Sequence, residues 1–251
     1  MIPVVIRRFA ELDALSRAAA DDFAAIAREA IGARGVCHVA LSGGSTPKRL
    51  FGMIAAMGRE ALPWDQIELW WGDERTVPAD HVDSNYRMAR ESLIEPLALT
   101  RVHPIDGGAA DPAEAARAYE AELTRVLGTS PMLDLVWLGM GPDGHTASLF
   151  PESPALVEDR RWVVANPVNS PLTKGATIRI TLTARAINNA RHVRFLVAGG
   201  DKAEALASVL AGPRRPARFP SQMIATDDLV WLVDEPAAAR LHAHDAPKDE
   251  H

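Results

Sequence analysis

A glycine-rich turn that ends in a histidine follows an apolar run near the middle of this 251-residue chain. The run and the turn extend from Asp134 to Ser148, with His145 directly after Gly-Pro-Asp-Gly. Open α/β sheets bind ligands at the carboxyl ends of their strands, and an imidazole can take up and return a proton near neutral pH. We therefore expect His145 to act in acid–base catalysis, with Asp143 orienting it or holding the turn. The alternative is an imidazole that only hydrogen-bonds its own loop.

The same turn contains the spacing G-x-G-x-x-G, which is typical of dinucleotide-binding proteins. The three glycines are Gly139, Gly141 and Gly144. We reject a dinucleotide site because Pro142 lacks an N–H, Asp143 would repel a pyrophosphate, and Pro151 interrupts the following helix.

An anion-binding loop is predicted after an earlier apolar run. Its residues are Ser42, Gly43, Gly44, Ser45 and Thr46, followed by Pro47. The glycines permit close backbone approach, Ser45 or Thr46 can cap a helix, and Pro47 suits the first helical turn, so free amides would face an anion. The alternative is a tight turn with a helix cap. The loop lacks the Gly-Lys-Ser/Thr ending of a Walker loop.

Further charged candidates follow or lie within other strand-like runs. Asp73 and Arg75 lie in a charged loop that would supply an oriented carboxylate and a guanidinium, or only an internal ion pair. Arg179 lies in a β-branched run and requires an anionic partner, either a phosphate or a carboxylate. Lys202 follows Gly-Gly-Asp at a helix start, where it would reach an anion or remain solvated. We interpret Asn85, which follows Asp83-Ser84, as part of a helix cap.

These residues require a sheet whose strand ends meet at one edge. Short β-rich runs alternate with longer helical patterns, which indicates an α/β fold with a doubly wound, mostly parallel sheet, helices on both faces (Rossmann-like) and a small irregular excursion. The predicted strands are 4–8, 36–41, 67–71, 133–138, 178–183, 193–198 and 229–233. The predicted helices are 11–33, 47–57, 85–94, 112–127 and 202–210.

We expect one α/β catalytic domain over residues 1–241 and a polar, flexible tail over residues 242–251. The proline-containing segment from Glu152 to Gly175 is the predicted excursion, which would form a flap. Three histidines in the tail do not indicate metal, because no cysteine or carboxylate cage accompanies them.

Composition excludes several classes of protein. A net charge of −6 and a pI near 5.8 argue against a nucleic-acid partner. No apolar run is long enough to span a bilayer, the N-terminus lacks the features of a secretory signal, and Cys37 is the single cysteine. We therefore expect a cytoplasmic protein without a membrane partner. The sequence does not indicate an oligomeric state.

Four segments together resemble the glucosamine-6-phosphate isomerase/6-phosphogluconolactonase family, and most closely its lactonases, over nearly the whole chain. They are Ser42 to Pro47, Gly72 to Pro78, Gly139 to Pro151 and Gly199 to Lys202. The resemblance implies hydrolysis of 6-phospho-D-glucono-1,5-lactone in the oxidative pentose phosphate pathway, without a metal or other cofactor.

The resemblance also implies roles for the candidate residues. His145 would be the general base and acid. The loop from Ser42 to Thr46 would bind substrate together with Asp73. Arg179 and Lys202 would face the phosphate, and Arg75 would contact the sugar acid or the oxyanion.

Two other functions use the same kind of fold. Amino-sugar phosphate deaminases of the family carry tyrosine at the position of Arg75 and glutamate at that of Phe150, so these two residues favour the lactonase. A non-catalytic sugar-phosphate sensor would leave the His145 turn unexplained. Such sensors usually carry a DNA-binding module, and we expect none ahead of the first strand, which is predicted to begin at Val4.

Overall fold

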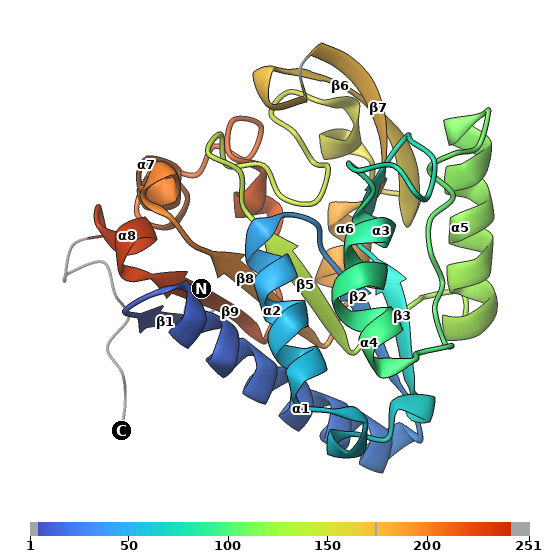
Figure 1. Ribbon diagram of the computed structural model, residues 1–251. Coiled ribbons are helices and arrows are strands. Elements are labelled where there is room, and N and C mark those ends of the chain that lie inside the picture. The colour runs from blue at the N-terminus through green and yellow to red at the C-terminus, as the bar shows by residue number, and fades with distance from the viewer. Residues whose placement is uncertain (1–4, 174, 242–251) are drawn as a thin grey trace.

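A parallel six-stranded sheet forms the centre of the computed structural model, which describes residues 5–173 and 175–241 (Figure 1). The strand order is β1-β9-β8-β5-β2-β3, and every pairing in this sheet is parallel. The strands are β1 (Val5–Phe9), β2 (Cys37–Leu41), β3 (Ile67–Trp71), β5 (Leu135–Gly139), β8 (His192–Val197) and β9 (Leu229–Asp234). The predicted mostly parallel α/β sheet is confirmed.

The helices connect these strands and pack against them. They are α1 (Leu12–Arg34), α2 (Ser45–Ala56), α3 (Asn85–Ala89), α4 (Glu95–Leu97), α5 (Pro112–Leu127), α6 (Ala184–Asn188), α7 (Ala203–Leu210) and α8 (Glu235–Ala238). Helices α1 and α2 lie side by side on the face of the sheet that is turned to the viewer in Figure 1. The predicted helix 85–94 is α3 continued by a π-helical turn, Arg90–Ile94.

Local sequence explains where the larger elements begin and end. The Asp111 side chain caps α5 by accepting the N–H groups of the second and third helical residues, and Pro112 occupies the first position. Helix α1 ends at Gly35, whose φ of 78° suits glycine. Strands β2 and β3 are buried at every position, as expected for parallel strands covered on both faces.

A second, antiparallel sheet includes the later part of the excursion that we predicted over residues 152–175. Its order is β4-β7-β6, with β4 (Asp73–Arg75), β6 (Val163–Ser170) and β7 (Gly175–Leu182). Strand β6 was not predicted because it contains Pro167. Since β6 is an edge strand that pairs only with β7, it tolerates a residue without an N–H. The predicted strand 178–183 belongs to this second sheet.

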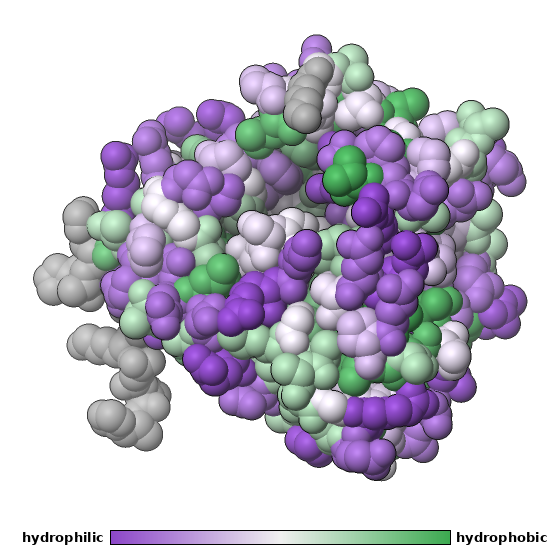
Figure 2. Space-filling view, in the orientation of Figure 1, coloured by the Kyte–Doolittle hydropathy of each residue, from purple (hydrophilic) through white to green (hydrophobic). Residues whose placement is uncertain are grey.

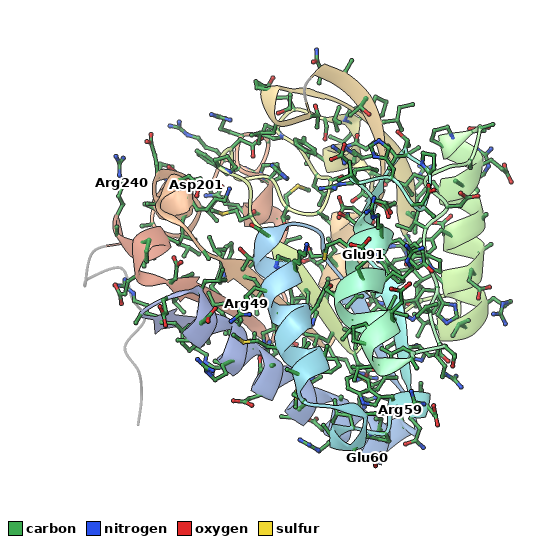
Figure 3. The ribbon with its side chains drawn as sticks, viewed as in Figure 1. Arg49, Arg59, Glu60, Glu91, Asp201 and Arg240 are labelled. Atoms are coloured by element: carbon green, nitrogen blue, oxygen red, sulfur yellow. The ribbon has the colours of Figure 1, made fainter. Side chains whose placement is uncertain are left out.

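Charged side chains lie on the outer surface of the molecule, including those of Arg49, Glu91 and Arg240 (Figure 3). The space-filling view shows a hollow beneath the β6–β7 hairpin (Figure 2). No helix within residues 5–173 and 175–241 has both the length and the apolar character needed to cross a membrane. Val4 and the predicted tail, residues 242–251, lie outside the described residues.

Candidate active site

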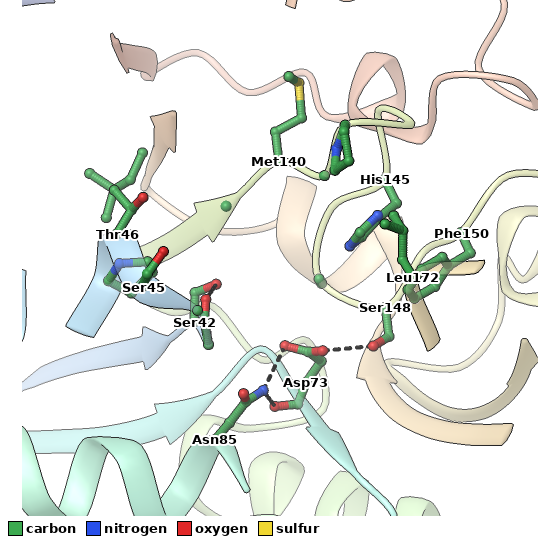
Figure 4. Close-up of a pocket in the computed structure, with 18 of the residues that line it drawn as sticks. Ser42, Ser45, Thr46, Asp73, Asn85, Met140, His145, Ser148, Phe150 and Leu172 are labelled. Atoms are coloured by element: carbon green, nitrogen blue, oxygen red, sulfur yellow. Dashed lines mark hydrogen bonds between the residues drawn. The ribbon is translucent and has the colours of Figure 1, made fainter. Parts of the chain in front are cut away.

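A cavity of about 270 Å³ lies where β2, β3, β5 and β8 end, next to the second sheet (Figure 4). Of the predicted site residues, those that line this cavity are Ser42, Gly43, Gly44, Ser45, Thr46, Asp73, Arg75, His145, Arg179 and Lys202. Asp143 does not line it but lies against His145. The structure therefore brings together residues from five separate segments of the chain.

His145 and Asp143 form a hydrogen-bonded pair at the end of the turn. Asp143 Oδ1 lies 2.6 Å from Nδ1 of the imidazole and also accepts the backbone N–H of His145 at 3.1 Å. Burial opposes ionisation of Asp143, but the hydrogen bond and charge of His145 outweigh it, so the pKa of Asp143 lies below its usual value. A carboxylate at Nδ1 selects the tautomer in which Nδ1 carries the hydrogen, which leaves Nε2 free to accept a proton.

Two further residues hold the imidazole in place. The Phe150 ring stacks on it, with centroids 4.1 Å apart and an angle of 18° between the planes. Gly141 lies so close that a Cβ atom there would be 2.1 Å from Nδ1 of His145. From the sequence we used Phe150 only as a difference between lactonases and deaminases, because stacking on an imidazole five residues away has no local sequence signal.

The loop after β2 presents the start of α2 to the cavity. Gly44 is the N-cap residue, with a φ of 104°, and no side chain caps the helix. The expectation that Ser45 or Thr46 would cap it is therefore wrong, because both already lie in the first helical turn. Their backbone N–H groups have no partner inside the helix, and the helix dipole favours an anion at this end.

Asp73 is a buried carboxylate on the cavity wall. Ser148 Oγ donates to its Oδ2 at 2.6 Å, and Asn85 Nδ2 donates to its Oδ1 at 3.2 Å (Figure 4). Asn85 was predicted to be structural, but it lines the cavity and packs against Gly43, where a Cβ would be 1.9 Å from Asn85 Oδ1. Ser84 is the residue that caps α3, by accepting the N–H of Arg87.

Two arginines lie side by side in the second sheet. Arg75 and Arg179 are opposite each other in the antiparallel pairing of β4 with β7. Within the described residues neither forms an ion pair, and Arg179 Nε is buried without a hydrogen-bond partner. Burial and then the charge of Arg75 lower the pKa of Arg179. Two adjacent guanidinium groups without a carboxylate between them form a site for an anion.

Lys202 reaches the cavity from another side. It ends a short 3₁₀ turn (Gly200–Lys202) that follows β8, so the predicted helix begins as α7 one residue later. Its Nζ lies 2.8 Å from Asp201 Oδ2, yet the side chain lines the cavity and is only 22% exposed. In the sheet order, β5 and β2 separate β8 from β3, which leads into β4. Lys202 and the two arginines therefore approach the cavity from different sides.

Metal-ion ligands do not gather in the part of the chain that the structure describes: no three His, Cys, Asp or Glu residues there are grouped as an ion would need. The tail histidines fall outside that part.

Comparisons with a family model, with curated relatives and with solved structures all point to the same family. A family model described as glucosamine-6-phosphate isomerases/6-phosphogluconolactonase matches residues 10–231. The chain is 44% identical over 221 residues to a 6-phosphogluconolactonase of Synechocystis sp., covering 85% of this chain and 88% of the relative. It is 37% identical over 246 residues to a 6-phosphogluconolactonase of Mycobacterium tuberculosis, covering 94% and 98%.

A solved structure is similar over almost the same length. The 6-phosphogluconolactonase from Trypanosoma cruzi superposes with a TM-score of 0.85 at 31% sequence identity, covering 96% of this chain and 98% of that one.

Proposed function

The chain belongs to the glucosamine-6-phosphate isomerase/6-phosphogluconolactonase family, and on that premise we propose that it hydrolyses 6-phospho-D-glucono-1,5-lactone to 6-phospho-D-gluconate in the oxidative pentose phosphate pathway. The observation that carries this proposal is one cavity that holds both the His145 imidazole, with Asp143 at its Nδ1, and three cationic side chains. The imidazole suits hydrolysis of the ester carbon, and the cations suit a phosphorylated substrate.

His145 is the proposed base and acid. Its Nε2 removes a proton from a water molecule while the water oxygen forms a bond to the lactone carbonyl carbon. The tetrahedral intermediate then collapses, the bond from that carbon to the ring oxygen breaks, and the imidazolium returns the proton to the ring oxygen. Asp143 holds the ring and stabilises its positive charge. Such proton transfer contributes about 10²- to 10⁴-fold to the rate, so positioning and oxyanion stabilisation supply the remainder.

The remaining site residues are proposed to bind the substrate. Arg179 and Lys202 neutralise the phosphate, and Arg75 contacts the sugar acid or the developing oxyanion. The loop from Ser42 to Thr46 offers backbone N–H groups at the start of α2, and Asp73 accepts hydrogen bonds from sugar hydroxyl groups. Because Arg75 lies directly beside Arg179, a bound anion also relieves the repulsion between the two guanidinium groups.

A lactone assay tests the function. Freshly prepared phosphorylated lactone, followed at slightly acidic pH where its uncatalysed opening is slow, should be hydrolysed far faster with the protein than without it. Glucosamine 6-phosphate in a parallel assay should release no ammonia. Binding of the product 6-phosphogluconate without any turnover of the lactone would indicate a sensor and contradict the proposal.

We propose a cytoplasmic protein whose partner is a phosphorylated sugar lactone, with no nucleic-acid partner. Cell fractionation and a nucleic-acid binding assay would check these two points.

A further inference from the structure

We propose that Ser148 is a positioning residue that holds the Asp73 carboxylate at a fixed place relative to His145. The inference rests on the proposed lactonase function and adds a residue to which that function assigns no role.

The Ser148 hydroxyl bonds to a carboxylate that has no cation of its own. Its Oγ donates to Asp73 Oδ2 at 2.6 Å, whereas Asn85 Nδ2 donates to Oδ1 at 3.2 Å and to the Asp73 backbone carbonyl at 2.9 Å. Ser148 is 1% exposed and Asp73 is 7% exposed. No Lys, Arg or His forms an ion pair with Asp73 in the described part of the chain. These two side-chain donors therefore fix both carboxylate oxygens, since a buried charge needs hydrogen bonds where it lacks an ion pair.

Ser148 is itself fixed by the second sheet. Its backbone N–H donates to Thr181 Oγ1 at 3.1 Å, and its carbonyl accepts from Asn166 Nδ2 at 2.8 Å. Thr181 and Asn166 belong to β7 and β6 and are 0% and 1% exposed. Because the backbone N–H and carbonyl of Ser148 are both hydrogen-bonded, its hydroxyl has little freedom to follow a moving carboxylate.

The bond crosses from one strand end to another. Ser148 lies three residues after His145 in the loop that follows β5, and Asp73 follows β3. These strands are not neighbours, because β2 lies between them. The Ser148–Asp73 hydrogen bond therefore sets the separation between the imidazole and the carboxylate directly, across the floor of the cavity (Figure 4).

The chemical consequence is orientation of the lactone. A fixed carboxylate accepts hydrogen bonds from sugar hydroxyl groups and repels the phosphate, so it directs the phosphate to the cations and the carbonyl carbon to His145. Reaction rates respond strongly to such alignment, since a misplacement of about 1 Å can cost about 100-fold. Loss of the Ser148 hydroxyl should therefore lower kcat more than it raises KM, because the phosphate contacts remain.

A double-mutant cycle tests whether Ser148 acts through Asp73. The four proteins are the wild type, Ser148→Ala, Asp73→Ala and the double variant, each assayed for kcat and KM with the phosphorylated lactone. We expect Ser148→Ala to lower kcat/KM by about tenfold or more in the wild type and by less than about twofold in the Asp73→Ala background. Equal losses in both backgrounds would show a structural role only, and no loss in the wild type would refute the proposal outright.

Ser221→Ala is the matched control. Its hydroxyl is as buried as that of Ser148, at 1% exposure, and supports the same turn by donating to the Gly144 carbonyl at 2.9 Å, but it does not contact Asp73. Ser221→Ala should change kcat/KM by the same factor in the wild type and in the Asp73→Ala background. Thermal unfolding reports whether each variant folds, and Ser148→Cys, which keeps the size and weakens the donor, replaces Ser148→Ala in the cycle if the alanine variant does not fold. A wild type without lactonase activity would refute the function itself, which is a separate outcome.

Discussion

Asp143 accepts two hydrogen bonds from His145, one from Nδ1 of the ring at 2.6 Å and one from the backbone N–H at 3.1 Å. A single carboxylate oxygen thereby fixes both the ring and the turn that carries it. The arrangement gives the imidazole one orientation and one tautomer before any substrate arrives, and such preorganisation is what acid–base catalysis needs.

Removal of the imidazole should abolish most of the activity. His145→Ala should lower kcat for the lactone by about 10²- to 10⁴-fold, which is the contribution of a positioned acid–base group. The measurement is hydrolysis corrected for the spontaneous reaction, with product binding by calorimetry as the control for an intact cavity. Unchanged turnover would exclude His145 as the base.

Neutralising Asp143 should also slow the reaction while leaving the ring in place. Asp143→Asn keeps an acceptor oxygen for Nδ1 but cannot stabilise the imidazolium, so we expect kcat to fall by about 10- to 100-fold with little change in KM. The matched control is Asp13→Asn, which removes a carboxylate paired with Arg49 at the outer surface of α1. If both variants had full activity, Asp143 would be a structural turn residue only.

Adding one methyl group beside the imidazole should displace it. In Gly141→Ala the new Cβ would be 2.1 Å from His145 Nδ1 and 2.8 Å from Asp143 Oδ1, so the pair must move apart. We expect a loss of activity of about 100-fold or more. Gly52→Ala, within α2, meets no atom within 4 Å and should keep activity and gain slightly in thermal stability. Full activity of Gly141→Ala would mean that the ring is not held where we describe it.

The cationic residues should determine preference for the phosphorylated lactone. Arg179→Ala and Lys202→Ala should each lower kcat/KM for the phosphorylated substrate by about 10-fold or more, with a much smaller effect on the unphosphorylated lactone, because a charge-assisted contact is lost. Arg49→Ala removes an exposed arginine of α2 and controls for net charge. Equal losses on the two lactones would place that residue's role elsewhere than at the phosphate.

The free energy of unfolding should decrease as the pH falls below 6.5, because of His38, which lies outside the active site. Burial lowers the pKa of His38 below 6.5, although the charges of Glu68 and Asp134 oppose this effect. The indole N–H of Trp70 donates to His38 Nδ1 at 3.3 Å, a bond that only the unprotonated nitrogen can accept. The contribution of His38 is therefore complete above pH 6.5 and is lost as the pH falls through the lower value in the folded protein.

The variant His38→Asn keeps an acceptor for Trp70 and removes the titration, so the free energy of unfolding should depend less on pH just below 6.5. Glu68 titrates over a lower pH range than the one in which this effect is expected. Burial opposes its ionisation, but the hydrogen bond from Arg101 and the charge of His38 outweigh it, so its pKa lies below 4.5. An identical pH dependence of unfolding in wild type and variant, measured by urea titration, would contradict the prediction.

Most of the parallel sheet follows from local pattern, and most of the cavity follows from the sheet. The buried runs that form β2, β3 and β5 are apolar at nearly every position, and each is followed by a loop with glycine or charge. Parallel strands place their carboxyl ends at one edge, so the loops of Ser42, Asp73 and His145 had to meet.

The second sheet and its contacts could not be predicted in the same way. Strand β6 is hidden by Pro167, and the pairing that brings Arg75 next to Arg179 joins segments about a hundred residues apart. Asn85 and Ser148 lie at the site through contacts with Asp73 on another segment, and Phe150 through stacking on His145 of its own loop, whereas the sequence shows only a possible helix cap and a continued turn. Long-range side-chain contacts of this kind have no periodicity that a local pattern reveals.

The junction at Gly72 links β3 of the parallel sheet to β4 of the antiparallel one without an intervening loop. The imidazole is carried by the first sheet and the paired guanidinium groups by the second, so the proposed reacting group and two of the proposed substrate-binding groups belong to different sheets. Mutations at exposed positions of β6 and β7 are therefore expected to alter which phosphorylated lactone is accepted, while the His145–Asp143 pair stays intact. In directed evolution toward new lactones, the hairpin is the segment to randomise.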